Sequence, residues 1–188
     1  MLRVILVPIF LIFLIGKGIP YGSIIATLIF IIASLTDQLD GYIARSRNQI
    51  TNFGKFMDPL ADKLLVTAAL ISLVELHLIP SWAAVIIIAR EFAVSGLRTV
   101  AASEGTVIAA SWWGKIKTVT QIIAILLLLL QVNIESIKAL NSSFEASAFL
   151  NNFFAYAPKI ALFIAIAMTI ISGIDYFIKN KGAISSNK

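Results

Sequence analysis

Long apolar segments alternate with short polar ones along most of the chain. Two stretches, Ile24–Leu35 and Ile122–Leu130, contain no charged side chain. Runs of this kind are too apolar for the surface helix of a globular protein, and they suit a bilayer, which a helix of about 20 residues crosses. The pattern predicts six spans, over Leu2–Ile15, Tyr21–Leu35, Pro59–Leu78, Trp82–Val100, Ile116–Gln131 and Ala157–Ile178. We therefore expect an all-α, polytopic membrane protein with six transmembrane helices.

Turn-forming and polar residues separate the predicted spans. The sequence GKGIPYG follows the first span, an Ile-Pro-Ser break at residues 79–81 follows the third, and the polar segment Asn133–Asn152 follows the fifth. No cleavage site of small residues follows the first apolar run, which favours a retained helix over a removed signal peptide. We expect a single transmembrane domain over residues 1–178, followed by a short basic cytoplasmic tail over residues 179–188.

The composition excludes several classes of protein and site. Hydrophobic residues make up 59% of the 188 positions and charged residues only 13%, unlike an ordinary soluble domain. The absence of cysteine excludes disulfides, thiolate metal sites and cysteine nucleophiles. The single histidine, His77, lies near a predicted helix end and fits an ordinary place at the membrane interface. A Ser-His-Asp triad or a zinc site built on several histidines is therefore not expected.

The basic residues predict the orientation of the spans. With six spans, both termini share one side of the membrane, and all but three of the 15 lysines and arginines fall on that side. The exceptions are Lys17, Lys138 and Lys159. The positive-inside rule makes this side cytoplasmic, in the inner or plasma membrane of the cell. The net charge of +5 is explained by this bias and by attraction to anionic membrane lipids, and no nucleic-acid partner is expected.

Acidic residues cluster in one stretch between two very apolar segments. Four of the five aspartates lie there, at Asp37, Asp40, Asp58 and Asp62. On helices, spacings of three and four residues put each pair on one face. Pro59, directly after Asp58, indicates a helix start with Asp58 as the N-cap. Carboxylates beside hydrocarbon are costly, so this cluster indicates a functional site.

The residue types in this stretch favour phosphoryl chemistry with a divalent metal. Four neighbouring carboxylates need cations to offset their repulsion, and hard oxygen ligands suit Mg²⁺ or Mn²⁺, which often share their shell with substrate phosphates. Gly41 and Ala44 leave one helix face bare for a ligand, and Arg45 can pair with a phosphate oxygen. Gly54 suits the same purpose. The alternative, that the small residues only let spans pack, does not explain the four carboxylates.

The whole stretch resembles the signature of the CDP-alcohol phosphatidyltransferases, D-x-x-D-G-x-x-A-R, eight residues, then G-x-x-x-D-x-x-x-D. The resemblance implies a six-helix membrane enzyme, a homodimer, with a cytosol-facing polar cavity. It also implies two divalent cations, Mg²⁺ or Mn²⁺, and Asp62 as the general base on the acceptor hydroxyl. The implied metal ligands are Asp37, Asp40, Asp58 and Asp62. The implied CDP-lipid-binding residues are Thr36, Gly41, Ala44, Arg45 and Gly54.

Basic residues that follow the aspartates in the sequence indicate which kind of acceptor alcohol the site would bind. Arg90 lies in an apolar surrounding, with Glu91 next to it, and Arg98, Lys115 and Lys117 follow. Arg90 either pairs with Glu91 or an aspartate, or contacts substrate, because an unpaired arginine in a span is costly. The other three serve either as positive-inside anchors or as part of an anion pocket. Together the four would suit an acceptor that carries its own phosphate.

Three further blocks, DPLADKLLV, IIIAREFAVSGLR and GKIKT, resemble the bacterial phosphatidylglycerophosphate synthases in particular. This resemblance implies CDP-diacylglycerol as donor, sn-glycerol 3-phosphate as acceptor, and CMP as the second product. The likeness extends from Leu2 to Tyr176 and is weakest across Asn133–Asn152. It has one departure: such proteins begin with a segment N-x-P-N-x-x-T before the arginine that Arg3 matches, and here only Met1 and Leu2 precede it.

Three alternatives remain open on the sequence. Within the family, the acceptor could instead be serine, inositol phosphate or phosphatidylglycerol, and the basic pocket argues against serine. A divalent-cation transporter would use the carboxylates for permeation, but such sites usually lie near the middle of the bilayer. A non-catalytic membrane scaffold gives no reason for the carboxylates.

Overall fold

The computed structural model describes the backbone of residues 2–16, 18–47, 52–103, 108, 111–141 and 147–180. Within these ranges it describes the side chains of all residues except 2–3, 37–47, 52–62 and 148. The two aspartate pairs therefore have a described helical backbone, but their side chains lie outside the described set.

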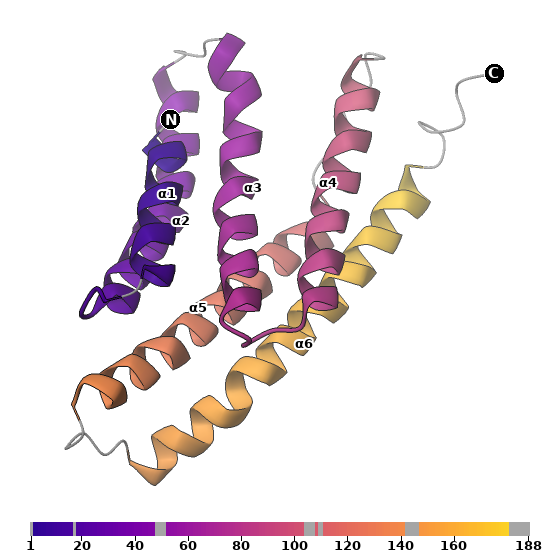
Figure 1. The fold of residues 1–188 in the computed structure, drawn as a ribbon. Coiled ribbons are helices and arrows are strands. Elements are labelled where there is room, and N and C mark those ends of the chain that lie inside the picture. The colour runs from indigo at the N-terminus through magenta and orange to yellow at the C-terminus, as the bar shows by residue number, and fades with distance from the viewer. Residues whose placement is uncertain are drawn as a thin grey trace.

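The described chain forms six α-helices, which confirms the all-α prediction. They are α1 (Leu2–Ile15), α2 (Gly22–Arg47), α3 (Asn52–Glu75), α4 (Ser81–Ser103), α5 (Trp112–Leu140) and α6 (Ala148–Lys179). Helices α1 to α4 run alongside one another, and α5 and α6 form a pair that crosses them obliquely (Figure 1). The end of α2, the start of α3 and the end of α4 lie at the same end of the molecule (Figure 1).

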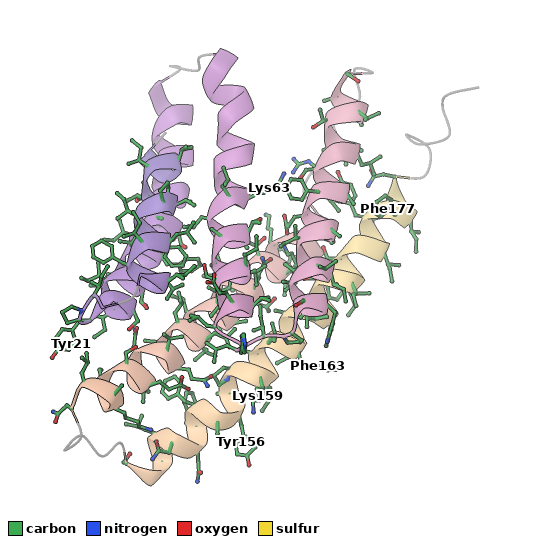
Figure 2. All side chains as sticks on the ribbon, viewed as in Figure 1. Tyr21, Lys63, Tyr156, Lys159, Phe163 and Phe177 are labelled. Carbon is green, nitrogen blue, oxygen red and sulfur yellow. The ribbon has the colours of Figure 1, made fainter. Side chains whose placement is uncertain are left out.

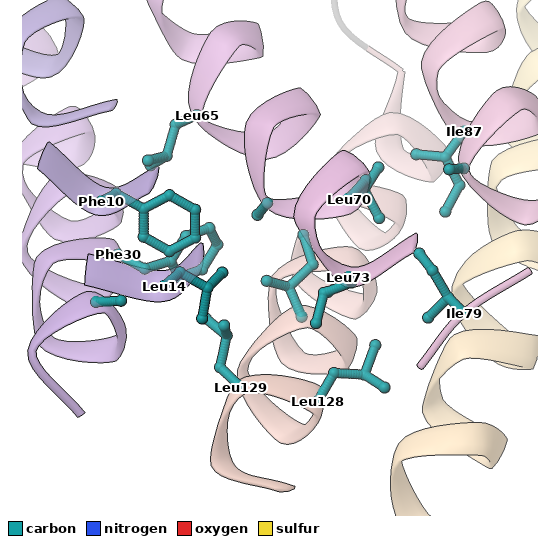
Figure 3. Close-up of a cluster of buried hydrophobic side chains, with 14 of the residues drawn as sticks. Phe10, Leu14, Phe30, Leu65, Leu70, Leu73, Ile79, Ile87, Leu128 and Leu129 are labelled. Atoms are coloured by element: carbon teal, nitrogen blue, oxygen red, sulfur yellow. The ribbon is translucent and has the colours of Figure 1, made fainter. Parts of the chain in front are cut away.

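A core of buried apolar side chains joins α1, α2, α3 and α5, and it includes side chains of α4 and α6 (Figure 3). Phe10 of α1 and Phe30 of α2 are completely buried, with ring centroids 6.0 Å apart. Leu70 and Leu73 of α3 pack in the same cluster as Leu129 of α5. Helix α3 packs against α1, α4 and α5, and its buried side chains from Leu65 onward anchor it in the bundle.

Polar contacts fix the register of α5 against α2. Asn133 Nδ2 donates to Thr27 Oγ1 at 3.0 Å, and Ser23 Oγ donates to Ser136 Oγ at 3.1 Å. Thr27 also donates to the carbonyl of Ser23, so its hydroxyl is used twice in a buried setting. Interhelical hydrogen bonds of this kind hold helices together where the surroundings are apolar.

The helices extend beyond the apolar runs that predicted them. The second predicted span ends at Leu35, whereas α2 continues to Arg47, because its backbone hydrogen bonds do not depend on apolar side chains. The prediction of Asp58 as a helix N-cap is wrong: α3 begins at Asn52, and Pro59 lies inside it. A proline within a helix removes one hydrogen bond, and neighbouring helices in a bundle tolerate that loss.

The predicted extent of the polar connection after the fifth span, Asn133–Asn152, is also wrong. Helix α5 continues to Leu140, and α6 begins at Ala148 with Ser147 as its N-cap. The polar residues here stay helical because they sit on helix faces that hydrogen-bond across the bundle, as Lys138 does with Asn151 at 2.6 Å.

His77 lies in the turn after α3, in the left-handed backbone region at φ 60°. Its N–H donates to the carbonyl of Val74, and the N–H of Leu78 donates to that of Leu73, which closes the helix in a Schellman motif. Histidine is among the side chains that tolerate this conformation. The residue is exposed and lies at a helix end, as predicted, and its place at the membrane interface stays a prediction.

Within the described residues, two helical segments, Trp112–Leu140 and Phe149–Lys179, are long and apolar enough to cross a membrane. Two shorter apolar segments, Val4–Ile15 and Gly22–Thr36, accompany them. Large apolar side chains are exposed on the outward faces, as Phe163 on α6 shows with 72% of its surface accessible (Figure 2). Many large apolar side chains exposed on long helices are typical of a protein surface that contacts lipid.

Candidate active site

Both aspartate pairs lie at one end of the helix bundle. Asp37 and Asp40 fall in the last turns of α2, and Asp58 and Asp62 fall in the first turns of α3. Residues 48–51 connect the two helices, so the four positions come to the same end of the molecule (Figure 1). The backbone thus gives the aspartate stretch the paired-helix arrangement that its spacings indicate.

A cavity of about 340 Å³ lies between α2, α3, α4 and α5, on the core side of the aspartates. Half of the residues that line it are apolar, and the others are three lysines, one glutamate, one glutamine and three residues with hydroxyls. These polar residues are Lys63, Lys115, Lys117, Glu91, Gln121, Ser34, Thr67 and Thr118. The wall therefore has an excess of positive charge, as a site for an anionic ligand requires.

On α2 and α3, the helix face that lines the cavity also carries the aspartate positions. On α3, Val66 lines the cavity, and Asp62 and Asp58 occupy the positions four and eight residues before it. On α2, Ala33 lines the cavity, and Asp37 lies four residues after it. Residues four apart lie one above the other on a helix, about 6 Å along its axis. The register therefore places both aspartate pairs on the helix faces that border the cavity.

A buried ion pair crosses the cavity wall from α4 to α5. Lys117 Nζ pairs with Glu91 Oε1, and the Lys117 side chain is only 3% exposed. Arg90 Nη1 lies 3.6 Å from the same carboxylate oxygen. One glutamate thus offsets two cations, which is why Lys117 is held in a buried position. The alternative that Arg90 pairs with Glu91 is confirmed.

Arg90 extends this network to α6. Its Nη2 donates to Ser172 Oγ at 2.5 Å, and the methylene Cγ packs on Gly173, where an added Cβ would approach it to 3.3 Å. Arg90 and Arg98 both interact electrostatically with the phenol of Tyr176. The guanidinium of Arg90 therefore ties α4 to α6 and does not line the cavity itself.

The remaining sequence-predicted residues divide between the cavity and the surface. Lys115 lines the cavity and lies 5.8 Å from the ring centroid of Trp112, a cation–π distance. Arg98 is exposed and is not among the lining residues. The Thr36 hydroxyl donates to the carbonyl of Ile32. For Gly41, Ala44, Arg45 and Gly54, which lie on the described backbone of α2 and α3, the side-chain predictions fall outside the described residues.

Among the cavity residues that sequence reasoning missed are Lys63 and Gln121. Lys63 extends from α3 toward α4, where it contacts Ser95 Oγ (Figure 2). Gln121 is on α5, one turn after Lys117, and is 3% exposed. The i, i+4 spacing of Lys117 and Gln121 was a signal for a shared face. Lys63 was signalled only by its position next to Asp62.

The donor set fits a divalent cation. Carboxylates at the four aspartate positions on adjoining helix ends would supply hard oxygen ligands, which Mg²⁺ and Mn²⁺ prefer. Among the side chains that the structure describes, no group of three acidic or histidine residues forms another candidate metal site. If the protein binds a divalent metal, the aspartate stretch is therefore the candidate site.

Comparisons with known proteins agree with the motif. A family model for the CDP-alcohol phosphatidyltransferases matches residues 1–172. A CDP-diacylglycerol–glycerol-3-phosphate 3-phosphatidyltransferase of Bacillus subtilis is 46% identical, over 98% of this chain and 94% of the relative. The protein of that name from Haemophilus influenzae is 42% identical, over 98% and 92% respectively. A probable phosphatidylglycerophosphate synthase of Mycobacterium tuberculosis is 37% identical, over 94% and 76%.

The family match covers both aspartate pairs, all residues of the cavity wall and five of the six helices completely. On this match and these near full-length relatives, the chain belongs to the CDP-alcohol phosphatidyltransferase family.

Proposed function

We propose that this protein is a phosphatidylglycerophosphate synthase, which transfers the phosphatidyl group of CDP-diacylglycerol to sn-glycerol 3-phosphate and releases CMP. One observation carries the proposal: a lysine-lined cavity lies on the same helix faces as the four signature aspartates. Relatives that carry the name of this activity and match nearly the whole chain support it. An anionic acceptor suits a wall with three lysines and one glutamate.

The reaction needs one new phosphorus–oxygen bond and the loss of another. The acceptor hydroxyl oxygen attacks the phosphorus that carries diacylglycerol, its proton passes to Asp62, and CMP departs with the electron pair of the pyrophosphate bond. Two divalent cations held by Asp37, Asp40, Asp58 and Asp62 would offset the pyrophosphate charge and stabilise the departing CMP. Asp62 suits the role of base because its position on α3 is the aspartate position nearest the cavity.

The acceptor phosphate is assigned to Lys115 and Lys117, with Arg90 and Arg98 as further basic residues at this end of the bundle. Lys115 and Lys117 line the cavity from α5. Lys117 pairs with Glu91, and Arg90 Nη1 lies 3.6 Å from the same glutamate oxygen. A buried ammonium fixed in this way presents positive charge to an anion without having to be reoriented.

The donor site is assigned to the ends of α2 and α3. Thr36, Gly41, Ala44, Arg45 and Gly54 would contact the CDP moiety, with small residues allowing close approach to the backbone. The diacyl chains would then extend along the exposed apolar faces of the bundle.

We further assign six membrane spans, with the active site and both termini on the cytoplasmic side. The distribution of lysine and arginine supports this orientation, and the exposed apolar faces support the spans. The homodimer is likewise a proposal that rests on the family. We also propose a single transmembrane domain over residues 1–178, followed by a short basic tail; the family model covers residues 1–172.

The direct test supplies purified protein in detergent with CDP-diacylglycerol, Mg²⁺ or Mn²⁺, and one acceptor alcohol at a time, and measures CMP. Release is expected with glycerol 3-phosphate and not with serine, inositol phosphate or phosphatidylglycerol. Release with another acceptor alone would keep the aspartate chemistry and overturn the acceptor assignment. If folded protein releases no CMP with any acceptor, the assignment of phosphatidyltransferase activity would be overturned.

A further inference from the structure

Gln121 carries a hydrogen-bond donor that the protein leaves unused. The side chain lines the cavity and is 3% exposed, and its Nε2 is buried without a hydrogen-bond partner in the described part of the chain. Buried polar groups are nearly always bonded, and a buried donor left unsatisfied costs about 1–3 kcal/mol. An amide in this state at a cavity wall indicates a ligand that completes it.

The surroundings of Gln121 restrict what that ligand atom is. Ile87 and Ile122 in the adjoining wall offer only hydrocarbon. The nearest charged group along α5 is Lys117, one turn toward the aspartate end and about 6 Å along the helix axis. Because Nε2 is a donor, the missing partner is an acceptor oxygen, and Gln121 lies one turn farther along α5 from the aspartate end than the lysine that we assign to the phosphate.

We propose that Gln121 donates to the C2 hydroxyl oxygen of the acceptor and thereby selects glycerol 3-phosphate; this inference rests on the proposed function. Of the acceptor's oxygen groups, the phosphate is assigned to Lys115 and Lys117, and the attacking C1 hydroxyl must reach the aspartates. The C2 hydroxyl is then the group left for the inner wall. Gln121 contacts a non-reacting atom and is a specificity-determining residue.

This hydrogen bond would let the enzyme distinguish glycerol 3-phosphate from an acceptor that lacks the C2 hydroxyl. With 3-hydroxypropyl phosphate, which lacks only the C2 hydroxyl, the buried amide stays unsatisfied in the transition state. The wild-type protein should therefore prefer glycerol 3-phosphate in kcat/KM by roughly 10- to 100-fold. Gln121→Leu removes the donor at similar size, so the preference should fall to within about twofold.

The experiment compares kcat/KM for these two acceptors in the full-length protein in detergent, for the wild type and two variants. Gln131→Leu is the matched control, because Gln131 lies on the same helix outside this cavity and bonds Glu135. It should keep the wild-type ratio. If Gln121→Leu does not fold, Gln121→Asn withdraws the donor by one methylene and should lower the same ratio.

A fall in the ratio that is confined to the Gln121 variants supports the inference. An unchanged ratio, or equal losses with both acceptors, overturns it, and so does a wild-type protein that shows no preference. These results differ from failure of the proposed function, in which wild-type protein would release no CMP with glycerol 3-phosphate at all.

Discussion

Loss of the Glu91 carboxylate should destabilise the protein more than loss of either of its two basic partners, Lys117 and Arg90. In Glu91→Gln, Lys117 and Arg90 both lose their acidic partner, and the Lys117 side chain is only 3% exposed. Removing one partner of a buried ion pair costs about 3–5 kcal/mol. Because the Glu91 side chain keeps 21% exposure to the cavity, we take the lower end, about 3 kcal/mol. For a chain of this size, this corresponds to a fall in Tm of about 6–12 °C.

The matching cation variant should cost less. In Lys117→Met, Glu91 still has Arg90 at 3.6 Å, so no buried charge is left alone, and the loss should be about 1–2 kcal/mol. The double variant should be less destabilised than the sum of the two single variants, with a coupling energy of about 1 kcal/mol or more. Glu75→Gln, at an exposed glutamate, is the control and should change Tm by at most about 2 °C.

Thermal unfolding of the purified variants in one detergent, followed by circular dichroism, measures these shifts. Strict additivity of Glu91→Gln and Lys117→Met would refute the reasoning, because it would mean that the two side chains do not interact. A Glu91→Gln variant as stable as the control would refute it as well, since the Glu91 carboxylate would then contribute nothing to stability.

Three further predictions concern the reaction and the bundle. Asp62→Asn should abolish CMP release but retain CDP-diacylglycerol binding, and wild-type rates would exclude Asp62 as the base. Asp37→Ala should raise the Mg²⁺ concentration needed for half-maximal activity by roughly tenfold or more; an unchanged requirement would count against its ligand role. Asn133→Leu removes the buried bond to Thr27, which should lower stability by about 1 kcal/mol in thermal unfolding and leave KM unchanged; a Tm equal to wild type would contradict this.

The helices were predictable from the sequence, and so were the bounds of α1, but the ends of α2, α3 and α5 were not. A long apolar run identifies a span because hydrocarbon excludes unpaired backbone groups and charged side chains. It does not say where the helix stops, since a helix satisfies its own backbone beyond the membrane. Helix α2 therefore continues through polar residues to Arg47, and α3 begins before Pro59, at Asn52.

The candidate site was also predictable from the sequence only in part. The aspartate spacings and the signature are local patterns, and they can be recognised without a fold. The contacts of Lys117 with Glu91 and of Arg90 with Ser172 join residues on different helices. Such pairs depend on how the helices pack, which no local pattern specifies. The unsatisfied amide of Gln121 is of this kind, because it is recognised only when its surroundings are known.

The central claim is that the phosphatidyl group of CDP-diacylglycerol moves to glycerol 3-phosphate. It is tested most directly by mass spectrometry of the lipid formed from CDP-diacylglycerol and glycerol 3-phosphate that is fully deuterated on carbon. The account predicts phosphatidylglycerophosphate that carries the whole deuterium label, in amounts equal to the CMP released. CMP accompanied by unlabelled phosphatidic acid would contradict it, because water would then be the acceptor.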